Sequence, residues 1–504
     1  MARMEFQILM PGTGAVALIL VASYLIYFTL SALYLLWLHP LSKYPGPKLW
    51  AISRIPWARH IVRGDLWRQL DRLHEKYGPT VRIAPDEITT ISPGAWKDIY
   101  VAKPVLPKDP YSQTPPLNGA HSLFTAAGDT QRRIRSTLVN GFSDKALREQ
   151  SPIIEGYADQ LVARLCREAA RDPDGVVDVQ KFFGYATFDT VTDLSFGESF
   201  HGLQGSNEHS WIQAFFFHAK FGTIRNCLSR FSPLDIFLGL FLLGVTRKNR
   251  ERNWRVTTAM IDRRLSRGDL TGVRSDFMTP VIGRIDESGT KGITKKELVT
   301  NGLAFVIADC QLTTVALSTS TYLLLRDPHK WRRLVDEVRS HFESGEQISV
   351  QSTQGLAYLE AVIHETLRLH HPTPISLPRS VPPEGRTIDG TVVGINLQNI
   401  QNSPAWWVEP RSFHPERFLP ATHALYDGRF DKDNKAAFMP FSTGPRNCLG
   451  AKVFMAQARV FLAKTVWYFD LVMQGNQEQW LDQKAYLVFE PKPLPVKVIQ
   501  RKVQ

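Results

Sequence analysis

Long apolar stretches and short alternating stretches divide the chain, and the first apolar stretch lies near the N-terminus. Residues 15–38 contain no charged side chain. This uncharged run is long enough to form a helix that crosses the hydrocarbon core of a bilayer. A cleaved signal peptide is the alternative, but its apolar region is shorter and ends at small residues. Here the run ends in Leu35-Leu36-Trp37-Leu38. We therefore expect a membrane anchor at 1–40, with a transmembrane helix over about 15–38.

The segments that follow change their period several times. Tyr44-Pro45-Gly46-Pro47 cannot continue a helix, because proline fixes φ and lacks the amide hydrogen, so a Pro-rich hinge is expected at 41–50. Apolar residues recur every three to four positions over 66–77, which predicts a helix. Residues 80–84 and 87–91 alternate between apolar and polar positions, which predicts two short strands.

The remaining chain is mostly helical in pattern. Helical periodicity dominates over 93–370 and returns over 451–466, while 381–400 and 480–498 have strand character. We find no internal repeat and no abrupt change of composition. The expected fold class is mainly α with a small β-sheet portion, an α+β protein in which 51–504 form one catalytic domain.

Composition and charge limit the cellular compartments and the classes of binding partner that fit this chain. The chain has 504 residues, is 43% hydrophobic and carries a net charge of +12. No basic tail or nucleic-acid motif accompanies this charge, so an anionic membrane leaflet or an acidic electron-donor protein explains it better than nucleic acid. The four cysteines show no pairing pattern, which favours a reducing compartment. They are Cys166, Cys227, Cys310 and Cys448.

The charges on either side of the anchor predict its orientation. Only Arg3, beside Glu5, precedes the apolar run, whereas basic residues follow it closely. By the positive-inside rule, the body after the anchor faces the cytosol. The basic residues that follow are Lys43, Lys48, Arg54, Arg59 and Arg63.

The most informative segment for chemistry is the loop that contains Cys448. Its sequence from Phe441 to Gly450 has the pattern Phe-x-x-Gly-x-Arg-x-Cys-x-Gly. Gly444 and Gly450 allow turns and close approaches that a Cβ would block. Arg446 can pair with a carboxylate through two hydrogen bonds.

A helix directly after Cys448 would place its N-terminal amides near the sulfur, which favours a thiolate. A buried structural cysteine is the simpler interpretation of a single thiol, but the complete pattern argues against it.

This loop resembles the cysteine-ligand loop of the cytochrome P-450 superfamily, the haem-thiolate monooxygenases. Glu365-Thr366-Leu367-Arg368 resembles the Glu-x-x-Arg of that family, and 413–418 resembles its Pro-Glu-Arg-Phe segment. The anchor and the prolines after it occur in the family's order. The overall texture is similar to filamentous-fungal enzymes of specialised metabolism.

The resemblance implies a cytochrome P-450 fold with haem b between a long central helix and the cysteine loop. Cys448 would be the axial ligand of the haem iron, with Phe441, Gly444 and Gly450 shaping the loop. Glu365, Arg368 and Arg417 would form a buried structural cluster. The cations expected on the haem propionates are Arg135, Arg379 and Arg446, with Gln131 standing where the family usually has an aromatic residue before Arg135.

The central helix, expected at 301–325, departs from the family pattern. Where the resemblance implies an acid followed by threonine for proton delivery, this chain has Gln311 and Leu312. Leucine cannot carry a proton and glutamine does not titrate. Thr313 and Asp309 are nearby, but they lie roughly 100° and 200° around an undistorted helix from the positions they would replace. The three residues of this departed oxygen-activation motif are Gln311, Leu312 and Thr313.

Two functions remain open at this point, and a third class, a catalytically silent haem-binding protein, is disfavoured because the other pocket motifs are intact. The first is a monooxygenase that uses O2 and electrons from NADPH through a cytochrome P-450 reductase, with cytochrome b5 as a further donor. The second is a redox-neutral haem-thiolate cyclase or isomerase, suggested by Gln311-Leu312. Both are expected in the endoplasmic reticulum membrane, single-pass, acting on a lipophilic specialised metabolite. The pocket candidates are mainly apolar: Phe305, Ala308, Leu312, Thr373, Ile375 and Val488.

Overall fold

The computed structural model describes residues 13–112, 119–205, 220–231, 234–268, 274–382 and 391–502. Residues 1–12 of the expected anchor segment and 383–390 of the expected strand-and-turn region lie outside the described residues. The described chain is mainly helical with two small sheets, which confirms the expected fold class.

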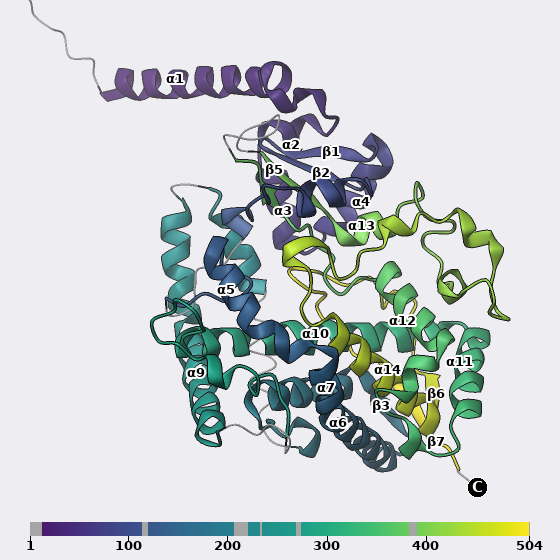
Figure 1. Ribbon diagram of the computed structural model, residues 1–504. Coiled ribbons are helices and arrows are strands. Elements are labelled where there is room, and N and C mark those ends of the chain that lie inside the picture. Colours follow the sequence, from purple (N-terminus) through teal and green to yellow (C-terminus); the bar gives the residue numbers. More distant parts are fainter. Residues whose placement is uncertain are drawn as a thin grey trace, which may run out of the picture.

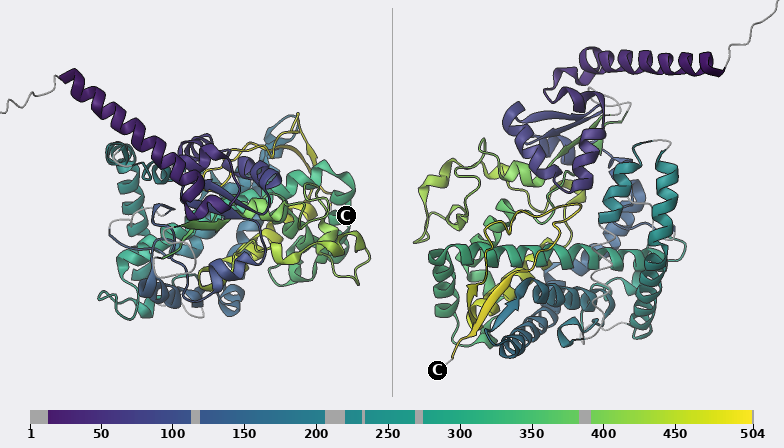
Figure 2. Two further views of the ribbon diagram at one scale, coloured as in Figure 1. Left: turned by 90° about the horizontal axis from the view of Figure 1, so that it is seen from above. Right: turned by 180° about the vertical axis from the view of Figure 1, so that it is seen from behind.

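The N-terminal apolar run forms helix α1 (Thr13–Leu33), continued by a π-helical turn at Tyr34–Leu38. This helix lies apart from the rest of the molecule in Figure 1 and in the right-hand view of Figure 2. None of its apolar window is buried, and its mean hydropathy over that window is 2.2. Helix α10 (Lys295–Arg326) is also long and apolar, but 78% of its window is buried. The exposed helix therefore suggests a single membrane anchor, while α10 belongs to the core.

A four-stranded sheet lies beside the anchor, in the order β1-β2-β5-β4. Strands β1 and β2 are the two short strands that the alternating pattern predicts, and they pair antiparallel. Strands β2 and β5 pair in parallel across some 300 residues of chain. A second sheet, in the order β3-β7-β6, joins the C-terminal tail to the middle of the chain. The strands are β1 (Thr80–Ala84), β2 (Glu87–Thr90), β3 (Val176–Asp178), β4 (Arg379–Ser380), β5 (Val392–Ile395), β6 (Phe469–Met473) and β7 (Pro495–Gln500).

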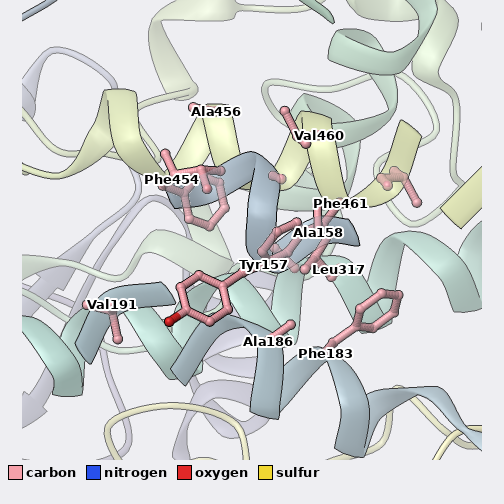
Figure 3. Packing of buried hydrophobic residues seen from close by; sticks show 14 of the residues in the cluster. Tyr157, Ala158, Phe183, Ala186, Val191, Leu317, Phe454, Ala456, Val460 and Phe461 are labelled. Carbon is pink, nitrogen blue, oxygen red and sulfur yellow. The ribbon is translucent and has the colours of Figure 1, made fainter. Parts of the chain in front are cut away.

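The helical body is built around α10, which crosses the middle of the molecule (Figure 1). Side chains from α6, α7, α10 and α14 meet in one large apolar cluster (Figure 3). The remaining α-helices are α2 (Lys48–Ile52), α3 (Ile55–Arg63), α4 (Leu66–Tyr77), α5 (Gly128–Leu138), α6 (Asp144–Arg171), α7 (Val179–Phe196), α9 (Leu234–Ser266), α11 (Pro328–His341), α12 (Ala357–Leu369), α13 (Leu397–Gln401) and α14 (Ala451–Tyr468).

Helix α10 starts six residues before the predicted position because of its N-cap. The Thr294 hydroxyl accepts a hydrogen bond from the Glu297 amide at 3.2 Å, and the Glu297 carboxylate accepts one from the Thr294 amide at 3.0 Å. This reciprocal pair is a capping box, which satisfies two amides that otherwise lack partners at a helix start. Arg133 of α5 pairs with the same carboxylate at 2.7 Å, so the cap also fixes α5 against α10.

The prolines after the anchor lie against β1. The guanidinium of Arg82, only 1% exposed, donates hydrogen bonds to the carbonyl oxygens of Leu35 and Pro85, each at 2.7 Å. The Arg82 amide also donates to the Pro45 carbonyl at 2.8 Å. A Cβ on Gly46 would lie 2.3 Å from the Arg82 carbonyl oxygen, so only glycine fits this close approach. The segment expected as a hinge is therefore tied to the body through Arg82.

Replacing Arg82 with methionine should loosen this joint. Each hydrogen bond from a charged donor contributes about 1.5–3 kcal/mol, so local opening around Lys43 should rise by roughly tenfold or more. We expect trypsin to cleave full-length Arg82→Met after Lys43 at least about tenfold faster than wild type. Arg59→Met serves as the control, and equal cleavage rates in all three proteins would contradict the role assigned to Arg82.

Candidate functional site

The loop before α14 turns sharply so that the Cys448 amide faces back along the chain. The Cys448 amide donates to the Phe441 carbonyl at 2.9 Å, and the Asn447 amide donates to the Gly444 carbonyl at 3.0 Å. Gly444 has φ of +77°, and a Cβ there would lie 2.2 Å from the Tyr100 carbonyl oxygen. This position therefore requires glycine for both its conformation and its contact.

Cys448 is an exposed residue, unlike the buried Cys227 and Cys310. The protein atoms around its sulfur desolvate the thiol and raise its pKa, and the Asp309 carboxylate raises it further. The backbone N–H groups of Gly450 and Ala451 donate to the sulfur and act in the opposite direction. They belong to the start of α14, so the helix terminus supplies donors for a thiolate.

Gly450 differs from Gly444 in what it requires. Its φ is −85°, which any residue adopts, and a Cβ there would meet no described atom within 4 Å. The close approach expected at both glycines is therefore found only at Gly444, and Gly450 contributes through its amide.

Four cations surround the approach to this loop. Arg446 donates to the Ala126 carbonyl at 2.9 Å and Lys108 to the Phe124 carbonyl at 2.7 Å. Lys108 also pairs with Arg379 through the backbone. Arg135 of α5 donates to the Asn447 carbonyl and side-chain oxygens at 3.0 and 2.6 Å. The structure thus brings the three predicted arginines together and adds Lys108, which sequence reasoning missed.

These cations repel one another. Burial, followed by Arg446 and Arg379, lowers the pKa of Lys108 to about 7. Burial likewise lowers the pKa of Arg446, with Arg379 and Arg135 contributing. Nη1 of Arg446 and Nε of Arg379 are buried without a hydrogen-bond partner in the described chain. No described carboxylate forms an ion pair with any of the four, so the group is suited to bind an anion.

Lys108 could not be found from local pattern. It lies in a loop without periodicity and becomes part of the group only because the chain at 107–109 pairs with β4. The only signal is a lysine between Pro107 and Asp109, which points to no particular function.

Glu365 and Arg368 lie one turn apart on α12, and both side chains are fully buried. Arg368 donates two hydrogen bonds to the Glu365 carboxylate at 2.7 and 2.9 Å. Arg417 donates to the same carboxylate at 3.1 Å. The His414 amide adds a fourth donor at 2.8 Å. The three predicted residues thus meet in one network that joins α12 to the segment around residue 414.

A fourth charge completes this network. The Asp433 carboxylate, also fully buried, accepts from Arg417 at 2.6 Å and from the Val408 amide at 2.8 Å. Two carboxylates therefore balance two guanidinium groups, which is what a buried ionic cluster needs to offset desolvation. The predicted triad alone carried an excess positive charge, and Asp433 was missed because it stands in a loop outside any helical pattern.

The predicted oxygen-activation residues lie on different sides of α10, which is regular from Lys295 to Arg326. Gln311 is only 2% exposed, and its Nε2 has no described partner. Leu312 is partly exposed. The Thr313 hydroxyl is fully buried and donates to Asp309 Oδ1 at 3.3 Å. The residues at the positions of the expected acid and alcohol do not contact each other in any described hydrogen bond.

The pocket candidates separate into two groups. Ala308, Thr373 and Ile375 are partly exposed, as is Leu312. Phe305, in contrast, is buried with its ring against Phe142 and Phe277, at centroid distances of 5.2 and 5.9 Å. Val488 is also buried. Phe305 and Val488 are thus packed within the protein, while the other four have accessible side chains.

The chain is similar to proteins of the family that the cysteine loop resembles. The cytochrome P-450 family model matches residues 44–498. The chain is similar to an averantin hydroxylase of Dothistroma septosporum, with 37% identity covering 96% of this chain and 91% of that protein. It is 35% identical to the cytochrome P-450 monooxygenase efuB of Hormonema carpetanum, covering 95% of each. An averantin hydroxylase of Aspergillus parasiticus is also 35% identical, covering 96% of this chain and 97% of that protein.

Removing one member of the buried charge network should destabilise the protein strongly. Glu365→Ala leaves Arg368 and Arg417 with one carboxylate between them, which should cost about 3–5 kcal/mol. Glu360→Ala is a matched control on the same helix, because its pair with Arg459 is 3.4 Å long and partly exposed, worth about 1 kcal/mol or less. Denaturation by guanidinium measures both, and equal midpoints would contradict the structural role.

Proposed function

The chain belongs to the cytochrome P-450 family and is one of its monooxygenases, and on this premise we propose that it oxidises a lipophilic small molecule of fungal specialised metabolism. The observation that carries the proposal is the meeting of an exposed cysteine, two helix-terminal amides and an unpaired group of cations. Relatives at 35–37% identity come from fungi, and two are hydroxylases by name.

A haem fits the residues around Cys448. In the proposed site, the Cys448 sulfur binds the iron, and the amides of Gly450 and Ala451 stabilise its negative charge. Gly444 allows the loop to lie against Tyr100 without a Cβ in between. Since the sulfur is held by backbone groups, its position depends on the fold of the loop more than on any neighbouring side chain.

The cations fit the two carboxylates that a haem carries. Arg446, Arg379, Arg135 and Lys108 have no described acidic partner, and two of their donors are buried without a hydrogen bond. Burial, together with repulsion by Arg446 and Arg379, lowers the pKa of Lys108 to about 7, and two propionates would offset both effects. Lys108 then joins the three predicted arginines as a residue that binds the cofactor.

When bound, the haem supplies the site where O2 is reduced and one oxygen atom passes to the substrate. The chain's own residues hold this cofactor, orient the substrate and exclude water around it. The accessible residues Ala308, Leu312, Thr373 and Ile375 are mostly apolar and favour a lipophilic substrate. Electrons come from NADPH through a membrane-bound reductase, whose acidic surface would suit the net charge of +12.

The exposed apolar helix α1 supports membrane attachment. We place the enzyme in the endoplasmic reticulum membrane with its body in the cytosol, because the basic residues follow the anchor. Among these basic residues, Arg54 pairs with Asp86 and Glu87 and Arg63 pairs with Asp65, which leaves Lys43, Lys48 and Arg59 to face anionic lipid.

Product analysis separates oxygenation from the redox-neutral alternative. Purified holoenzyme is incubated with the pathway intermediate, with and without reductase, NADPH and O2. A monooxygenase makes product only when all three are present and incorporates label from 18O2. Product formed without NADPH would identify a cyclase or isomerase and overturn the proposed reaction.

Cys448→Ser tests the iron ligand. We expect this variant to lose the red-shifted Soret band of the reduced carbon-monoxide complex, because that band depends on thiolate ligation. Cys166→Ser is the matched control, since this thiol is partly buried on α6 and should leave the spectrum unchanged. A wild-type spectrum in Cys448→Ser would exclude Cys448 as the ligand.

Neutralising the cations should weaken cofactor retention. Lys108→Met and Arg446→Leu each remove a donor to a propionate, a charge-assisted hydrogen bond worth about 1.5–3 kcal/mol. Transfer of haem to apomyoglobin should therefore be roughly tenfold faster or more in each variant. Lys97→Met, at an exposed position, is the control. Unchanged transfer in both variants would remove these residues from the cofactor site.

A further inference from the structure

The central helix has an accessible face near the cysteine loop. Between residues 300 and 324 of α10, the partly exposed residues are Ile307, Ala308, Asp309 and Leu312, and all others are buried. Ala308, Asp309 and Leu312 form this face, because they lie within roughly 100° of one another around a regular helix, whereas Ile307 lies about 160° from Asp309. The negative charge of Asp309 raises the pKa of the Cys448 thiol, so this face and the sulfur are electrostatically close.

Asp309 is the only acid on that face, and two donors hold its carboxylate. Gln457 of α14 donates from Nε2 to Oδ2 at 2.8 Å. Thr313, one turn along α10, donates to Oδ1 at 3.3 Å. Gln457 and Thr313 are both fully buried, so they fix the carboxyl group of a residue that is itself partly exposed.

The side of α10 on which Asp309 lies is that of Leu312, although the sequence pattern relates Asp309 to Gln311. Asp309 lies roughly 200° from Gln311 around the helix, but only about 60° from Leu312. Gln311 is buried, so the position of the expected acid faces the protein interior. Asp309 shares the face of the position where an alcohol was expected, without any distortion of α10.

We propose that Asp309 handles the protons of oxygen reduction in this enzyme, in place of the acid and alcohol that Gln311 and Leu312 replace, with Thr313 and Gln457 as its positioning residues. This inference rests on the proposed monooxygenase function. The carboxylic acid of Asp309 gives one proton to the oxygen undergoing reduction, and the carboxylate then recovers one proton from bulk solvent, so its charge is restored after each transfer. Electrons come from the reductase, and no bond to Asp309 carbon forms or breaks.

The surroundings of Asp309 suit this task. Burial raises the pKa of Asp309 to about 6, and the hydrogen bonds from Gln457 and Thr313 limit this increase. A pKa near neutrality lets a carboxyl group both hold and release a proton under working conditions. Among the described residues, the ionisable groups that interact with its charge are Cys310, adjacent on α10, and Cys448 on the opposing loop.

The first test compares Asp309→Asn with wild type in reconstituted holoenzyme. Asparagine keeps the size and the acceptor for Gln457 but cannot deliver a proton. General acid catalysis typically contributes about 10²–10⁴-fold, so product per NADPH should fall at least tenfold while hydrogen peroxide rises. Asp336→Asn, an exposed position on α11, makes the same charge change as a control. Wild-type coupling in Asp309→Asn would overturn the proposal.

The second test needs no turnover. The infrared carbonyl band of a protonated carboxyl group should appear in wild-type holoenzyme as pH falls through about 6 and be absent from Asp309→Asn. Gln457→Leu and Thr313→Val each remove a donor that stabilises the carboxylate, so the midpoint of this band should move to higher pH. An unchanged midpoint in both variants would contradict the positioning roles.

The outcomes distinguish this inference from the proposed function. If wild-type enzyme forms no oxygenated product with NADPH, reductase and O2, the proposed function fails first. If wild type is active and Asp309→Asn retains its haem spectrum but loses coupling, Asp309 is the proton-handling residue. If Asp309→Asn loses its haem, product per NADPH in Gln457→Leu decides instead, because this variant keeps the carboxyl group but loses a hydrogen bond to it; wild-type coupling there would overturn the proposal.

Discussion

The balance of buried charges at Glu365, Arg368, Arg417 and Asp433 is the constraint on which the site depends. Taking four charges out of water is tolerable only when each finds opposite charges and further hydrogen bonds. Arg368 meets this need with carbonyls at residues 401, 410 and 412 as well as Glu365, so its guanidinium joins α12 to a long irregular segment. That segment continues directly into the loop that carries Cys448.

Two further contacts connect the buried charge network to the segment that leads to Cys448. Lys435 donates to the Arg417 carbonyl at 2.7 Å, and His371, just after α12, contacts the Pro440 carbonyl at 3.0 Å. The cysteine loop is thus held on its N-terminal side by this network and on its C-terminal side by α14. Because the loop has little regular structure of its own, its shape is set by these neighbours together with the glycine at position 444.

Sequence patterns predicted what is local and missed what depends on distant pairing. Helix α4 and strand β1 have the predicted bounds, since periodicity encodes which side is buried. Strand β6 follows α14 without an intervening turn, and its apolar run could not be distinguished from a helix end. Asp433 and Lys108 escaped notice because each stands in a loop without periodicity and gains its contacts only when that loop packs against other segments. The sequence did indicate Asp309, but its angle was measured from Gln311, and this comparison does not show that Asp309 lies on the same side of the helix as Leu312.

The joint made by Arg82 also affects how the enzyme would respond to its membrane. If the body were loosely tethered, its orientation toward the bilayer surface would not depend on the tilt of the anchor helix. Here Arg82 binds the carbonyl of Leu35 near the end of the apolar helix, so helix and body share one direction. A transmembrane helix adjusts its tilt to the thickness of the hydrocarbon layer. Lipid composition would therefore turn the whole catalytic body, changing the depth at which a lipophilic substrate meets it.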